Sequence, residues 1–158
     1  MYRLIQQNKQ IKLNDLPRGE NLTNFSILND LSEKHTFRSF SIKYVFEGRE
    51  HYLVNGSKYT VNSGEYLLAN SFCEGKIEID SNSMVKGICI DVSPTLLSEV
   101  FSSYIAPDSP MPDIQLDTFF NSASFLENKY KTSDTKLGKT LAQLSSKFKE
   151  HPDYDYKL

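Results

Sequence analysis

The chain contains no tryptophan, only two cysteines and three histidines, and no long apolar segment. Two cysteines cannot form a disulfide framework, so we expect both thiols to stay reduced and interpret Cys89 as a small buried apolar residue. The N-terminal residues lack the apolar stretch of a signal peptide, and no stretch is long enough to span a bilayer. These absences exclude a secreted disulfide-rich protein and a helical membrane protein, and they favour a cytoplasmic location.

A large excess of charge of either sign is also lacking. The formal net charge of the 158 residues is −2, which gives no reason to expect attraction to nucleic acid or to a membrane surface. The length is typical of one domain, and ten phenylalanines and nine tyrosines supply enough bulky apolar surface for a core. We therefore expect a single globular domain that itself binds no DNA.

Glycine-containing turns punctuate a run of β-branched and aromatic residues between positions 38 and 70. The Asn55-Gly56 pair is a strong signal for a type I′ hairpin, because both central residues of that turn need a positive φ. We interpret Glu47-Gly48 as a second two-residue hairpin turn, which would place His51 opposite Tyr44. Closely spaced short strands of this kind predict a sandwich or a small barrel.

The spacing of apolar residues changes from strand-like to helical after position 92. Strand-like segments cover 25–29, 37–46, 49–54, 57–61, 65–70, 75–80 and 84–92. Ser93 and Pro94 are favourable first residues of a helix over 93–105, and Ser133-Asp134 is expected to cap another over 134–149. A proline-rich loop should follow the first helix, and 119–131 is expected to be helical or mixed.

The chain therefore divides into an N-terminal arm over 1–24, a β-barrel over 25–92 and a helical segment over 93–158. The arm is either a frayed terminus with one or two edge strands or a segment lying across the mouth of the barrel. The fold class predicted is mainly β, a cupin-like barrel followed by C-terminal α-helices.

This arrangement resembles the N-terminal domain of AraC-type transcriptional regulators, a cupin barrel followed by a helical dimerisation segment. The resemblance rests on Phe40 to Gly48, Tyr52 to Gly56, Tyr59 and Gly64 to Leu68, with the helix around 135–144 in the place of the dimerisation helices. It implies a domain that binds a small effector and forms a homodimer. It also implies that DNA is bound only through a C-terminal domain that is missing from this chain.

Many cupins hold a catalytic metal through two histidines and a glutamate in a first motif and one histidine in a second. The resemblance places these ligands at His35, Phe37, Ser41 and Gly75, so only His35 is a ligand type. One imidazole cannot supply the three or four donors that a catalytic metal needs. We therefore expect no metal, no cofactor and no catalytic residues, and conclude that the chain is not an enzyme.

Strand parity gives a candidate ligand site. With two-residue turns, Ser41 and Lys43 share a face with Glu50 and Tyr52, and then with Tyr59. The resemblance places the Ser41 position inside the barrel, so Lys43 would face the interior beside the two tyrosines, with Glu50 or an anionic ligand as its partner. The alternative is that a bulge shifts the register and Lys43 faces solvent.

This interpretation suits a small ligand with a ring or sugar face and a negative or hydroxyl-rich group. Because Lys43→Met would remove a buried charge, we expect it to preserve folding and to abolish the response to the effector.

The second helix carries an apolar stripe formed by Leu137, Leu141, Leu144 and Phe148. Such a stripe most often packs on its own domain, but the resemblance places a dimer interface here, and we favour the dimer.

Two alternatives to a ligand sensor remain open: a stand-alone cupin enzyme such as an isomerase or dioxygenase, and a dimerisation module without a ligand. Bound metal and turnover would identify the first.

Overall fold

The computed structural model describes residues 2–6, 21–37, 39–70, 73–105 and 128–150. The elements follow the chain in this order: β1 (Tyr2–Gln6), β2 (Leu22–Phe37), β3 (Phe40–Glu47), β4 (Arg49–Val54), β5 (Ser57–Asn62), β6 (Glu65–Ala69), β7 (Cys73–Val92), α1 (Pro94–Ile105), β8 (Asn128–Lys131), the 3-10 turn η2 (Thr132–Asp134) and α3 (Lys136–Glu150). The prediction of a mainly β, barrel-like fold followed by helices is confirmed. The proline-rich loop and most of the arm lie outside the described residues.

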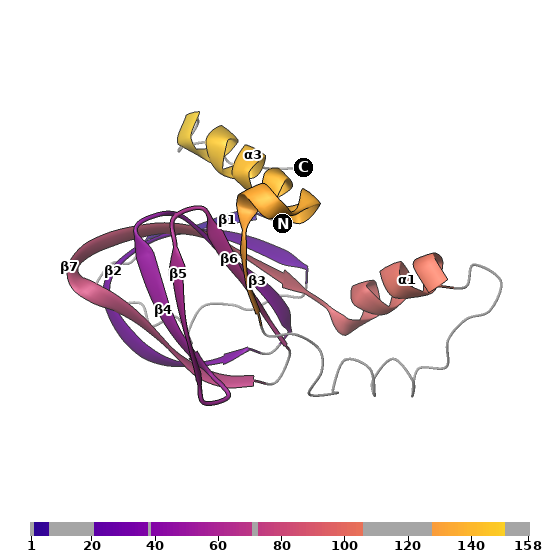
Figure 1. Cartoon of the computed structure of the whole chain (residues 1–158), viewed down its shortest axis with the longest axis horizontal. Coiled ribbons are helices and arrows are strands. Elements are labelled where there is room, and N and C mark those ends of the chain that lie inside the picture. Colours follow the sequence, from indigo (N-terminus) through magenta and orange to yellow (C-terminus); the bar gives the residue numbers. More distant parts are fainter. Residues whose placement is uncertain (1, 7–20, 38, 71–72, 106–127, 151–158) are drawn as a thin grey trace.

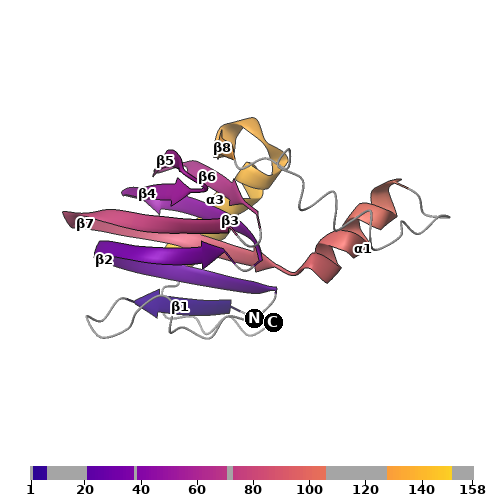
Figure 2. The same ribbon diagram turned by 90° about the horizontal axis from the view of Figure 1, so that it is seen from below.

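Two long strands, β2 and β7, form the spine of the barrel (Figures 1 and 2). They pair antiparallel along almost their whole length, with a bulge between Asn29 and Leu31. The second half of β7 also pairs with β3, whereas its first half pairs with β4. The strand β7 therefore contributes to both halves of the sheet, and the sheet curves around an enclosed core.

The Asn55-Gly56 hairpin is confirmed. Asn55 and Gly56 have φ values of 47° and 82°, and Val54 pairs with Ser57 directly across the turn. The positive φ at both central residues is what a type I′ turn requires. The same register places Tyr52 opposite Tyr59.

The prediction of a two-residue hairpin at Glu47-Gly48 is wrong. β3 lies between β6 and β7, and β4 lies between β5 and β7, so the two strands are not paired with each other. Gly48, with φ of 83°, instead forms a corner at which the chain passes from one half of the sheet to the other. His51 consequently pairs with Thr60 and Glu78, not with Tyr44.

Gly48 is expected to be far less tolerant of alanine than Gly56, although both have a positive φ. A Cβ at Gly48 would lie 2.6 Å from the carbonyl oxygen of Met84, whereas a Cβ at Gly56 would meet nothing within 4 Å. Gly56→Ala should cost about 1–2 kcal/mol for the left-handed backbone alone. Gly48→Ala should cost clearly more, because the corner must also move. Urea denaturation of both variants measures the difference, and equal costs would contradict it.

The two α-helices in the described part of the chain each begin at a side-chain cap. The amide of Leu96 donates to Ser93 Oγ at 3.1 Å, which confirms Ser93 as the cap of α1. The cap of α3 is Thr135, whose Oγ1 accepts from the amide of Gly138 at 2.9 Å. The predicted cap, Ser133-Asp134, is wrong, because these residues belong to η2.

Thr135→Ala should therefore lower the free energy of unfolding by about 1 kcal/mol, the usual cost of losing a capping side chain. Ser133→Ala is the matched control two residues away. It should have almost no effect, since Ser133 is exposed and lies outside the helix. Thermal denaturation followed by circular dichroism compares them. A larger loss for Ser133→Ala would mean that the helix begins where the sequence suggested.

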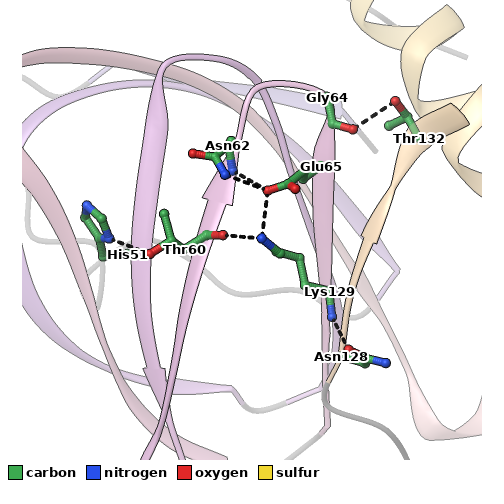
Figure 3. A network of polar contacts seen from close by, with 8 residues as sticks. All are labelled: His51, Thr60, Asn62, Gly64, Glu65, Asn128, Lys129 and Thr132. Atoms are coloured by element: carbon green, nitrogen blue, oxygen red, sulfur yellow. Dashed lines mark hydrogen bonds and ion pairs between the residues drawn. The ribbon is translucent and has the colours of Figure 1, made fainter.

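Of the segment 119–131, which was expected to be helical or mixed, only residues 128–131 lie within the described part of the chain, and they form the strand β8. β8 pairs antiparallel with β6. It also reaches toward β5: Lys129 Nζ donates to the carbonyl oxygen of Thr60 and to Glu65 Oε2, both at 3.0 Å (Figure 3). Glu65 also accepts from Asn62. Burial by itself raises the pKa of Glu65, but the bonds from Asn62 and Lys129 outweigh it and lower that pKa. These hydrogen bonds attach β8 to β5 and β6 of the barrel.

The apolar side chains form two separate cores. The inner core fills part of the barrel and includes Leu28, Val45 and Leu67. The outer core lies between the barrel wall and α3, where Phe25 stacks on Phe148 with ring centroids 4.4 Å apart. Alternate residues of β3 therefore face different cores, and this alternation decides which polar side chains enter the barrel.

Candidate ligand-binding site

The registers of three strands bring polar residues into neighbouring rows inside the barrel. One row runs from Asn24 on β2 through Cys89 on β7 to Lys43 on β3, and the next contains Asp91 and Ser41. Lys43 has the same strand parity as Val45, which belongs to the inner core. These side chains therefore face the interior.

Lys43 lies at the centre of this group and is only 7% exposed. Its ammonium donates to Cys89 Sγ at 2.6 Å, lies 4.0 Å from Asp91 Oδ1, and stands 5.4 Å from the centroid of the Phe37 ring. Burial opposes the charge on Lys43, but Cys89, Asp91 and Glu50 outweigh that penalty and raise its pKa. Lys43 is therefore a buried cation at neutral pH.

Cys89 is the sulfur neighbour of this cation and not simply an apolar filler, which corrects the interpretation from sequence. Burial raises the pKa of its thiol to about 11, although Lys43 pulls in the opposite direction. Cys89 is consequently a neutral thiol near pH 7, and its sulfur accepts the hydrogen bond from Lys43. Cys73 and Cys89 do not form a disulfide with each other, as expected.

Glu50 and Tyr52 form a second buried pair, on β4. The Tyr52 hydroxyl donates to Glu50 Oε2. Burial raises the pKa of Glu50, against the opposing effects of Tyr52 and Lys43. Burial and the neighbouring Glu50 together raise the pKa of Tyr52 well above its usual value, so the phenol keeps its proton.

Ser41 completes the group from β3, because its Oγ donates to Asp91 Oδ1 at 2.6 Å. The predicted ligand residues therefore include four buried ones, Ser41, Lys43, Glu50 and Tyr52. Tyr59 is partly buried and packs against the inner core from β5. Lys43 and Tyr52 are not opposite each other as predicted, because Lys43 pairs with Leu67 and Cys89.

The interpretation of the sequence missed three residues of this group: Asn24, Cys89 and Asp91. Asn24 was assigned to the arm, whereas it belongs to β2. Cys89 and Asp91 alternate with Ile88 and Ile90, which pack in or against the outer core. That period-two alternation was visible in the sequence and could have placed both polar side chains inside.

The four positions at which the resemblance expects metal ligands were tested against the structure. His35 pairs in register with Gly75, and Phe37 is buried in the inner core. Among the described residues, no three histidine, cysteine, aspartate or glutamate side chains lie close enough together to hold a metal ion. The arrangement is instead a cluster of hydrogen-bonding and charged groups around one lysine.

The proposed dimer stripe lies mostly inside the chain's own fold. Leu141 and Phe148 are 1% and 4% exposed and belong to the outer core, and Leu144 packs against it. Only Leu137, at 36%, is exposed. These three residues therefore pack on the chain's own domain, as the alternative interpretation held. The preference for a dimer interface at these residues was wrong. Whether the chain forms a dimer elsewhere stays a prediction.

No protein-family model and no curated protein match this sequence. Solved structures with a similar fold include the EutQ protein of Clostridium difficile, with 15% identity, a TM-score of 0.41, and coverage of 45% of this chain and 55% of that one. A cupin 2 conserved barrel protein from Salinispora arenicola has 10% identity, a TM-score of 0.41, and coverage of 51% and 68%. This chain thus spans little more than half of EutQ.

A third similar structure corrects the conclusion that the chain is not an enzyme. Salicylate 1,2-dioxygenase from Pseudaminobacter salicylatoxidans has 19% identity and a TM-score of 0.41, and the match covers 51% of this chain and 23% of the dioxygenase. Since an enzyme is among the similar folds, that exclusion is wrong, although the likeness assigns no reaction here.

Neither helix in the described part of the chain has the length and apolar character needed to cross a membrane. The structures similar to this chain are cupin-fold proteins, and at these identities the likeness concerns the fold alone.

Proposed function

We propose that this chain is the small-molecule sensing domain of a cytoplasmic AraC-type transcriptional regulator, with the effector bound inside the barrel. Effector binding would change the geometry of a homodimer, and thereby DNA binding by another domain of the regulator. The observation that carries the proposal is the buried polar group around Lys43. The pattern of turns and strands that resembles the AraC-type domains supports the regulatory part.

Burying these groups is costly unless they serve a purpose. A lysine, a glutamate and a tyrosine at 7%, 5% and 4% exposure lie in the same interior as apolar core residues. Replacing buried ion pairs by apolar side chains is often neutral or stabilising, so stability by itself does not explain their presence. A ligand that uses the remaining hydrogen-bonding capacity of these groups would explain why they are present. A ligand-free dimerisation module would have no need of them.

The test is a thermal-shift screen of a metabolite library on three proteins. The first is wild type, and the second is Lys43→Met/Glu50→Gln, which removes one buried charge of each sign. The matched control is Lys76→Met/Glu78→Gln, which removes an exposed ion pair of the same composition. An effector should stabilise wild type and the control, but not the interior variant.

Equal stabilisation of all three proteins would mean that the compound binds elsewhere and would contradict the site. If no compound stabilises wild type, the sensing proposal fails. The regulatory part is tested by a mobility-shift assay of the intact regulator with the compound found. DNA binding that does not respond to that compound would contradict it.

A further inference from the structure

Lys43 and Cys89 bring an amine and a thiol into close contact inside the barrel. The two residues pair in register on β3 and β7, and Lys43 Nζ lies 2.6 Å from Cys89 Sγ. An N–H···O hydrogen bond is about 2.9 Å long, and sulfur is a larger atom than oxygen, so this contact is short even for a hydrogen bond. A nitrogen and a sulfur atom joined through one oxygen atom by two single bonds lie at a similar separation.

Cys89 is also the more accessible of the two cysteines. It is only partly buried, whereas Cys73 is buried in the inner core. Its thiol donates to Asp91 Oδ1 at 3.5 Å. Burial keeps the pKa of this thiol high, so an attack by the sulfur needs a proton acceptor, and Asp91 is in place for that role. The thiolate so formed would lie against the ammonium of Lys43, which stabilises it.

The neighbouring position on β2 holds an unused hydrogen-bond acceptor. Asn24 pairs in register with Cys89, is 9% exposed, and has the same strand parity as Leu28 of the inner core. Among the described residues, its Oδ1 is the buried side-chain oxygen or nitrogen atom left without a partner. Buried polar atoms are almost always satisfied, so this atom calls for an explanation. A hydroxyl carried by the sulfur of Cys89, as in a sulfenic acid, is a donor of the kind that it lacks.

We propose that Lys43 and Cys89 form a redox-sensitive covalent bridge in which one oxygen atom links Lys43 Nζ to Cys89 Sγ. The oxidant is a hydroperoxide, which is small enough to reach a partly buried thiol. This modification goes beyond the proposed function and does not depend on it.

The reaction balances with two molecules of hydrogen peroxide. In the first step the sulfur of Cys89 attacks a peroxide oxygen: an S–O bond forms, the O–O bond breaks, water leaves, and sulfur is oxidised by two electrons to the sulfenic acid. The ammonium of Lys43 releases one proton to solvent. The second peroxide then takes one hydrogen from the amine and one from the sulfenic acid. An N–O bond forms, nitrogen is oxidised by two electrons, and two waters leave.

The bridge would change the group around Lys43 in two ways. It would tie β3 to β7 through side chains 46 positions apart in the sequence. It would also remove the cation, because a nitrogen bonded to oxygen is a much weaker base than a lysine amine. Within the proposed function, an oxidised domain would therefore no longer offer its effector the charge of Lys43.

Intact-protein mass spectrometry tests the bridge without any effector. The chain is reduced with dithiothreitol, desalted and exposed to hydrogen peroxide. Gain of one oxygen and loss of two hydrogens should make wild type about 14 Da heavier, and fresh dithiothreitol should reverse the gain. A tryptic digest should contain the peptide 39–49 joined to the peptide that begins at Gly87, because trypsin does not cleave after a modified Lys43.

Three variants locate the bridge. Cys73→Ser is the matched control: the sulfur of Cys73 accepts from the side-chain amide of Asn55 at 3.2 Å, and its loss should leave the gain of mass unchanged. Cys89→Ser removes the reacting sulfur and should abolish the gain. Lys43→Arg should abolish it too, because a guanidinium keeps its charge and never becomes a free amine. If Lys43→Arg does not fold, Cys89→Ser and the digest of wild type decide.

Other changes of mass would overturn the bridge. A gain of about 16 Da at Cys89 without a cross-link would show a sulfenic acid that Lys43 does not capture, and a loss of about 2 Da would show a disulfide or a direct S–N bond. An unchanged mass, or the same gain of 14 Da in Cys89→Ser, would overturn it as well. None of these outcomes bears on the thermal-shift screen, which decides the proposed function separately.

Discussion

Replacing Phe148 with alanine is expected to lower the free energy of unfolding by about 3–5 kcal/mol, the usual cost of truncating a buried phenylalanine. Phe148 lies near the end of α3 and is 4% exposed. Its ring stacks on Phe25 and meets Phe46 edge-on, with centroids 6.0 Å apart. Removing the ring would leave a cavity between helix and barrel, because the sheet wall cannot collapse into it. Urea denaturation followed by circular dichroism measures the loss.

Leu137→Ala is the matched control, since Leu137 lies on the same helical stripe but is exposed. Its effect should stay within about 0.5 kcal/mol. Light scattering on both variants and wild type then separates the two interpretations of the stripe. If Phe148→Ala changed the oligomeric state and left the stability of the fold unchanged, the residue would belong to a dimer interface after all.

Lys43→Met by itself is expected to destabilise the protein by about 3–5 kcal/mol at neutral pH, because it leaves the buried Glu50 and the partly buried Asp91 without their cation. This reverses the expectation from sequence, which treated Lys43 as a charge whose removal would be harmless. The structure shows why: Asp91 lies 4.0 Å from the ammonium, and Glu50 is buried within its electrostatic reach. Adding Glu50→Gln should recover part of the loss, and a double-mutant cycle measures the coupling.

The deficit of Lys43→Met should also depend on pH in a defined direction. Burial raises the pKa of Glu50 above its ordinary value of 4.5, and loss of Lys43 removes an effect that lowers it. The penalty for holding Glu50 ionised is therefore present above its pKa in the folded protein and disappears below 4.5. Denaturation should show a deficit that shrinks as the pH falls from 8 toward 5. A deficit independent of pH would mean that lost packing, and not the unpaired charge, is responsible.

Much of the local structure followed from short-range chemistry in the sequence. Asn55-Gly56 determined its hairpin because a positive φ at two adjacent residues is tolerated by few other pairs. Ser93 determined the start of α1 because its hydroxyl can satisfy an amide of the first turn. Alternation along β3 placed Ser41, Lys43 and Val45 on one face of the strand and their neighbours on the other. This assignment does not depend on which strands lie beside β3.

Which strands are neighbours was decided only by the tertiary structure. A glycine with positive φ can close a hairpin or turn a corner, and the close approach of Met84 to Gly48 makes it a corner. That corner places β7, and with it Cys89, beside Lys43.

The sequence by itself thus determined the class of fold, the hairpin and the faces of the strands, because each depends on a few consecutive residues. The composition of the polar group around Lys43, and the burial of Phe148 against Phe25, depend on contacts between residues dozens to more than a hundred positions apart. Such contacts are set by the packing of the whole sheet, which no local pattern encodes.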